Sequence, residues 1–122
     1  MSRISVETWR RLSHITGPGA VWMGLRFGAT PEDGPTIVRV LRPGKDDGAI
    51  KFDLDRYVSE VLEGVADANA KHGGDLMVEA IQVTPDDYPT PGQAKYVAYL
   101  IARNAITGEG YPSSPEPGSR ES

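Results

Sequence analysis

The sequence predicts an α+β domain, a two-layer sandwich in which a small, mostly antiparallel sheet is covered by two helices on one face. Two long segments carry apolar residues at helical spacing, and three shorter segments have strand character. They occur in the order strand–strand–helix–strand–helix, which favours this architecture. A chain of 122 residues has room for one such domain. We expect it to occupy residues 1–107, followed by a flexible tail over residues 108–122 that is rich in Pro, Gly, Ser and Glu.

The first part of the chain predicts a β-hairpin that follows a less regular segment. Residues 1–20 fit either one helical turn or an edge strand, and the edge strand is favoured. Apolar residues alternate with others from Val21 to Phe27, which predicts a strand with one buried face. A turn-rich connection leads to a second strand from Thr36 to Leu41. We expect these two strands to pair in antiparallel orientation.

The first helix is predicted from Leu54 to Lys71, because its apolar residues recur at a spacing of three and four. Asp53 is placed to accept a backbone N–H at the N-terminus of this helix. Phe52 can then pack against Tyr57 across the cap. The pair Gly73–Gly74 can supply the left-handed residue that ends the helix.

A third strand and a second helix complete the domain. The strand is predicted from Leu76 to Val83, which is apolar on both faces apart from two polar residues. The helix is expected to begin after Thr90, with Pro91 in the first helical position and Gln93 reaching back as in a capping box. It should end near Ile106, where glycine-containing sequence begins.

Composition and charge limit the classes of function. The chain is 39% hydrophobic and 25% charged, as globular domains are, and it has no apolar run near the length of about 20 residues that a membrane span needs. It contains no cysteine, which favours a cytoplasmic location, and its first residues lack the apolar centre of a secretion signal. The net charge of −4 provides no large basic footprint for nucleic acid.

A succession of short motifs runs through residues 16–106: Thr16–Leu25, Glu63-Gly64-Val65, Ala68-Asn69-Ala70, Gly73-Gly74, Val78–Thr84, Asp86-Asp87 and the alanine-rich stretch Ala98–Ala105. Together they resemble domain IV of translation elongation factor G. The resemblance implies a sheet with two helices and a left-handed β-α-β crossover. The sequence differs from that family in two respects. Its glycine-rich loop lacks the basic residue suited to ribosomal RNA, and the chain has no phosphate loop of a GTPase.

Few residues are arranged for chemistry. Asp86 and Asp87 lie between a predicted strand and a predicted helix, where paired carboxylates can bind a cation or support acid–base catalysis. The same residues can simply shape the turn and favour the positive end of the helix dipole, and this interpretation is favoured because no third ligand is near in sequence. His14 and His72 lack the spacing of paired metal ligands. The sequence predicts no catalytic motif, no metal site and no cofactor.

Two other features are candidates for binding. Gly17 and Gly19 belong to a turn-like segment that could cradle a phosphate through backbone N–H groups, although a simple turn is favoured. Tyr99 is expected on the outer face of the second helix, between Lys95 and Arg103. Tyrosine beside arginine is typical of binding hot spots.

Three functions are compatible with these observations. The leading hypothesis is a non-enzymatic protein-binding module that adapts or neutralises a partner protein with a basic surface, since a small acidic domain suits such a partner. The second, from the resemblance, is contact with the ribosome or RNA through the loops Gly17–Gly19 and Asp86–Pro91. It needs a basic patch, for which the candidates are Arg3, Arg10, Arg11, Arg26 and Arg39. The third is a small hydrolase or ligand-binding domain that uses Asp86 and Asp87 in a deep pocket. The identity of the partner and the oligomeric state stay open.

Overall fold

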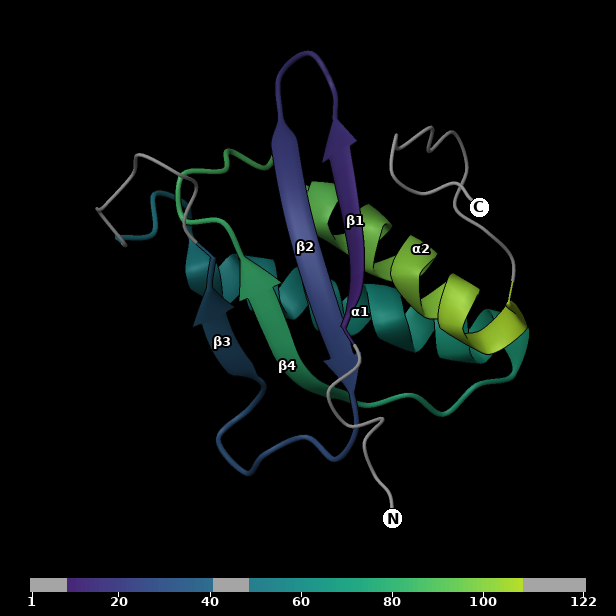
Figure 1. The fold of residues 1–122 in the computed structure, drawn as a ribbon. Helices are drawn as coiled ribbons and strands as arrows, with labels where there is room; N and C mark the ends of the chain where they lie inside the picture. The colour runs from purple at the N-terminus through teal and green to yellow at the C-terminus, as the bar shows by residue number, and fades with distance from the viewer. Residues whose placement is uncertain (1–8, 41–48, 109–122) are drawn as a thin grey trace.

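The computed structural model describes residues 9–40 and 49–108, which form a four-stranded sheet with two helices behind it (Figure 1). The elements are β1 (Arg10–Ile15), β2 (Ala20–Phe27), β3 (Thr36–Arg39), α1 (Leu54–His72), β4 (Val78–Val83) and α2 (Gln93–Thr107). This confirms the predicted α+β class with both helices on one face of a mostly antiparallel sheet. The tail expected over residues 108–122 lies outside the described residues beyond Gly108.

The strand order across the sheet is β1-β2-β4-β3. The favoured edge strand in the N-terminal segment is confirmed, because β1 pairs with β2 in antiparallel orientation at one edge. The expected antiparallel pairing of β2 with β3 is wrong. The other side of β2 is occupied by β4, and β3 lies beyond β4 and runs parallel to it. The short turn at residues 16–19 lets β1 pair with β2 as a hairpin. The longer connection at residues 28–35 lets the chain pass β4 and form β3 at the opposite edge of the sheet.

The connection from β3 through α1 to β4 has an uncommon hand. In Figure 1 both strands point upward, the helices lie behind the sheet, and β4 lies to the right of β3. A chain that rises in one strand, returns behind the sheet and rises again to the right forms a left-handed crossover. About 98% of such connections are right-handed, so this hand is a specific property of the fold. It is the hand that the resemblance to domain IV of elongation factor G implies.

The hydrophobic core lies between the sheet and the helices. Alternating residues of β2 enter the core, and the predicted apolar stripe of α1 meets them from the other side. The largest fully buried side chains of the core are Met23, Leu25, Ile81, Ile101, Val21, Val61, Val78, Val83 and Val97. The start of α1 agrees with the sequence-based prediction. The side chain of Asp53 accepts a hydrogen bond from the backbone N–H of Arg56 at 3.1 Å, and the rings of Phe52 and Tyr57 stack with centroids 4.8 Å apart.

The two helices touch most closely at Gly64 of α1. A Cβ atom built on this residue would collide with the backbone carbonyl of Lys95 and approach the Ala98 methyl group at 3.1 Å. Glycine is therefore the residue that allows the backbone of α2 to lie directly on α1. This contact sets the position of α2 and of the loop that precedes it.

We predict that Gly64→Ala lowers the free energy of unfolding by about 1–3 kcal/mol, because the added methyl group forces the helices apart. The intrinsic preference of helices for alanine, about 1 kcal/mol, opposes this loss only in part. Urea unfolding followed by circular dichroism measures the difference. Gly17→Ala is the control, since nothing lies within 4 Å of its Cβ position. Equal stability of the Gly64 variant and the wild type would contradict the close helix contact.

Candidate functional site

One end of the sheet brings together the two loops that the sequence analysis singled out. The turn between β1 and β2, at the top of Figure 1, lies beside the loop from β4 to α2. Ala20 and Tyr88 form an isolated antiparallel bridge, with both N···O distances at 3.3 Å. We call this region the hairpin end and define it as residues 14–20, residues 84–92 and Tyr96. It contains four of the predicted binding residues: Gly17, Gly19, Asp86 and Asp87.

The turn of the hairpin end is closed by its own hydrogen bonds. The backbone N–H of Thr16 donates to the carbonyl of Gly19 at 2.8 Å, and the N–H of Gly19 donates to Thr16 Oγ1 at 3.1 Å. A Cβ atom on Gly19 would collide with the side chain of Gln93, so glycine lets the turn pack against the start of α2. Gln93 is buried, and its Nε2 donates to the carbonyl of His14 at 3.2 Å. The segment is thus an anchored turn, with Gly17 exposed at its tip.

Asp87 ties the second loop to the sheet. Its side chain is buried, and Oδ2 accepts a hydrogen bond from the backbone N–H of Trp22 in β2 at 2.7 Å. Its own backbone N–H donates to the carbonyl of Thr84 at 3.0 Å and closes a turn. Asp86 beside it is half-buried. This geometry supports the structural interpretation of Asp87 that the sequence analysis favours.

The hydroxyl of Tyr57 belongs to the same buried environment. It is enclosed in the core without a hydrogen-bond partner. Burial raises the pKa of Tyr57 well above its ordinary range, and the negative charge of Asp87 raises it further. The phenol therefore stays protonated and neutral in the pH range in which proteins are stable. A neutral Tyr57 adds no second negative charge beside Asp87.

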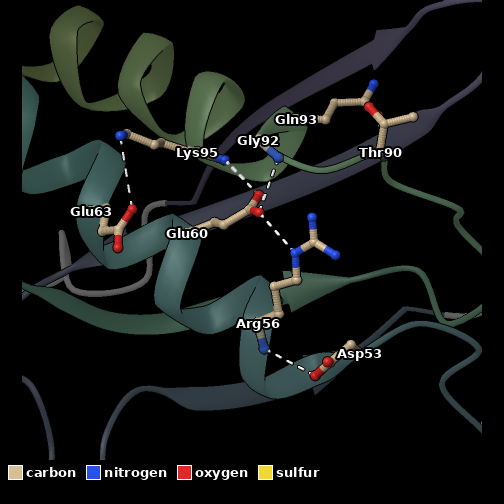
Figure 2. Close-up of polar contacts among 8 residues, drawn as sticks. All are labelled: Asp53, Arg56, Glu60, Glu63, Thr90, Gly92, Gln93 and Lys95. Carbon is tan, nitrogen blue, oxygen red and sulfur yellow. Dashed lines mark hydrogen bonds and ion pairs between the residues drawn. The ribbon is translucent and has the colours of Figure 1, made fainter.

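The start of α2 differs from the prediction, as Figure 2 shows. The N-cap is Gly92, with φ of 85°, and the helix begins at Gln93. The left-handed backbone of Gly92 interrupts the expected capping box, although the backbone N–H of Thr90 still donates to Gln93 Oε1 at 3.0 Å. The cap comes from α1 instead. Glu60 accepts hydrogen bonds from the backbone N–H groups of Gly92 at 3.0 Å and Lys95 at 3.4 Å.

The predicted hot spot on α2 lies against α1. The Nζ of Lys95 is 3.8 Å from Oε1 of Glu63 and 3.6 Å from Oδ2 of Asp67, both on α1. The hydroxyl of Tyr99 is 2.8 Å from Nε2 of His72 at the end of α1, and Arg103 is partly buried. The expectation that this stripe occupies the outer face is wrong, because α1 packs along it. Lys95 and Tyr99 therefore join the two helices.

Exposed apolar side chains gather at the hairpin end. The large hydrophobic residues exposed in the described part of the chain are Ile15 (73%), Leu62 (40%), Met77 (54%), Tyr88 (60%) and Tyr96 (47%). Three of these five belong to the hairpin end. Ile15 pairs with Ala20, which in turn pairs with Tyr88, so the side chains of Ile15 and Tyr88 lie on the same side of the sheet. The ring of Tyr96 contacts that of His14, with centroids 5.2 Å apart.

Comparison with protein-family models and with curated proteins gives no match to the chain. Within residues 9–40 and 49–108, no helix has the length and apolar character needed to cross a membrane. The same residues contain no group of three or more His, Asp or Glu side chains placed to hold a metal ion.

We predict that Asp87→Asn destabilises the protein by about 1–3 kcal/mol, because the buried acceptor loses its charge and its amide group cannot satisfy the same donors. Thermal or urea unfolding measures the change. Asp75→Asn is the matched control, since Asp75 is exposed, and it should alter stability by less than about 0.5 kcal/mol. Equal effects of the two substitutions would argue against the buried anchor.

Glu60→Ala should lower stability by about 1–2 kcal/mol, since it removes the acceptor for the first N–H groups of α2. Glu63→Ala, three residues further along α1, removes only a 61% exposed carboxylate and should change stability by less than about 0.5 kcal/mol. Hydrogen exchange of the Gly92 amide gives a local readout, and it should accelerate in the Glu60 variant alone. An unchanged exchange rate would contradict the cap.

Proposed function

We propose that the chain is a protein-binding module that docks on a partner protein through the hairpin end. The observation that carries this proposal is the pair Ile15 and Tyr88, which are 73% and 60% exposed and lie on the same side of the sheet. Tyr96, 47% exposed, lies beside His14 on the helix side of the same end. Exposed apolar side chains scattered singly are ordinary, but a group of them on adjacent segments is typical of an interaction site. Tyrosine is enriched at such sites because it combines a large apolar ring with a polar hydroxyl.

The hairpin end is also held in place before any partner arrives. Asp87 fastens one loop to β2, Gln93 fastens the other to the start of α2, and Glu60 fastens α2 to α1. A surface that is already ordered loses little conformational entropy on binding. Rigid anchors of this kind favour a defined partner.

Charge favours a partner with a basic surface. Residues 15–22 and 84–94 contain no lysine or arginine and two aspartates, and the whole chain has a net charge of −4. Long-range attraction therefore assists association with a basic protein and opposes contact with phosphates. The role that fits is the adaptation or neutralisation of such a protein, without catalysis, in the cytoplasm.

A ribosome-contacting protein related to domain IV of elongation factor G is the second candidate. The left-handed crossover and the order of elements support this relation. Under this proposal the same hairpin end makes the contact, with a basic ribosomal protein in place of RNA. A hydrolase or ligand site at Asp86 and Asp87 is not supported, because the buried carboxylate of Asp87 is engaged with the backbone of β2.

The experiment is affinity purification of the tagged protein from its own cell extract, with and without nuclease. We expect one stoichiometric partner protein that survives nuclease treatment. Ile15→Ser combined with Tyr88→Ser should reduce its recovery by at least tenfold, since hot-spot residues contribute about 2 kcal/mol or more. The matched control is Leu62→Ser combined with Met77→Ser, which removes exposed apolar side chains elsewhere.

Two results would contradict the proposal. One is recovery of the partner that falls equally with both pairs of substitutions. The other is recovery that is lost when nuclease is added, which would indicate that RNA mediates the contact.

A further inference from the structure

The face of the sheet turned away from the helices has a different character from the hairpin end. Along β2, Met23 and Leu25 are buried in the core, so Trp22 and Arg26 project from the opposite face. Arg11 of β1 pairs with Gly24 of β2 and lies on that same face. We call the surface formed by Trp9, Arg11, Trp22, Arg26 and Gln82 the open face.

The arginines of the open face are held by neighbouring side chains. The guanidinium carbon of Arg26 lies 4.9 Å from the centre of the Trp9 ring, a cation–π contact, and its Nε is 3.3 Å from Glu79 Oε1. The Nε of Arg11 donates to Gln82 Oε1 at 3.0 Å. This bond spans the position of Gly24, where a Cβ atom would collide with the Gln82 side chain.

The open face has a local excess of basic charge. It carries Arg11 and Arg26 together with the carboxylate of Glu79, which pairs with Arg26. The net charge of −4 for the whole chain does not reveal this surface. Arg11 is exposed and engages Gln82 through Nε alone, so its remaining donors face solvent.

We infer that the open face binds single-stranded RNA. Bases stack on aromatic side chains and on guanidinium planes, while arginine neutralises phosphates. Four-stranded sheets that present aromatic residues on one face are used in this way to hold two or three bases. On β2, Trp22 and Arg26 are separated by about 13 Å at the usual rise of a strand, and Arg11 occupies the row between them. This spacing leaves room for one base on each of these two side chains, with a phosphate contact to Arg11 between them.

The side chains of Ile15 and Tyr88 project from the same face of the sheet as Trp22, so the open face adjoins the hairpin end. The inference goes beyond the proposed function because it assigns a second kind of ligand to this face. An acidic peptide is the competing ligand, because it would also be attracted by two arginines. The two tryptophans favour RNA, since every base offers a flat ring for stacking and an acidic side chain offers none.

The fluorescence of tryptophan reports on this face directly, because the chain contains two tryptophans, Trp9 and Trp22, and both belong to it. The probe is a 12-nucleotide oligouridylate, titrated into the full chain at 50 mM and 200 mM salt. We expect quenching of the fluorescence and weaker binding at the higher salt concentration. Arg11→Glu should raise the Kd by tenfold or more, and Trp22→Ala should raise it by a similar factor when binding is followed by anisotropy of a labelled oligonucleotide.

Lys71→Glu is the charge-matched control, because Lys71 is exposed at the end of α1, and it should change the Kd by less than about twofold. The inference is overturned if the oligonucleotide causes no quenching at 50 mM salt, or if Arg11→Glu and Lys71→Glu weaken binding equally. It is also overturned if a 12-residue oligoglutamate displaces the oligonucleotide at equal concentration, which would assign the face to an acidic protein. The affinity purification with and without nuclease tests protein binding at the hairpin end separately, so failure of this inference is distinguishable from failure of the proposed function.

Discussion

The buried carboxylate of Asp87 is the interaction on which the candidate site depends. It accepts a hydrogen bond from the backbone N–H of Trp22 at 2.7 Å and so joins the loop after β4 to the first residues of β2. This bond lies next to the bridge between Ala20 and Tyr88, so both interactions hold the two loops of the hairpin end together. A buried acceptor of this kind gives the acidic residue a structural role.

The topology brings these two loops together. Because β4 lies between β2 and β3, its C-terminal end meets the start of β2, where the turn from β1 arrives. The left-handed crossover through α1 places β4 in this position while both helices stay on one face of the sheet. The close contact at Gly64 then fixes α2 against α1, and Glu60 holds the start of α2 beside the hairpin end. The site is therefore a consequence of the fold as a whole.

Local signals in the sequence predict the elements well and their long-range partners poorly. The cap at Asp53, the stacking of Phe52 on Tyr57 and the buried stripe of α1 depend on residues close in sequence, and all three are confirmed. The pairing of β3 depends on which strand occupies the free side of β2, and the sequence carries no local mark of that. The same limit applies to α2, since its cap comes from Glu60, 32 residues before Gly92.

The candidate site shows the same division. Gly17, Gly19, Asp86 and Asp87, which the sequence offered as binding residues, lie together at the hairpin end, where Gly19 and Asp87 serve its architecture. The exposed side chain of Ile15 could not be predicted, because its exposure follows from its place at the end of an edge strand. Net charge was an incomplete guide as well, since a chain with a net charge of −4 carries Arg11 and Arg26 together on its open face.

Site-specific photocrosslinking in living cells tests the central claim most directly. The substitutions Tyr88→p-benzoylphenylalanine and Met77→p-benzoylphenylalanine place the same reactive ring at two exposed positions, one in the hairpin end and one outside it. The account predicts one discrete protein adduct from position 88 and none from position 77. Adducts of equal yield from both positions, or from neither, would contradict the assignment of the hairpin end as the binding surface.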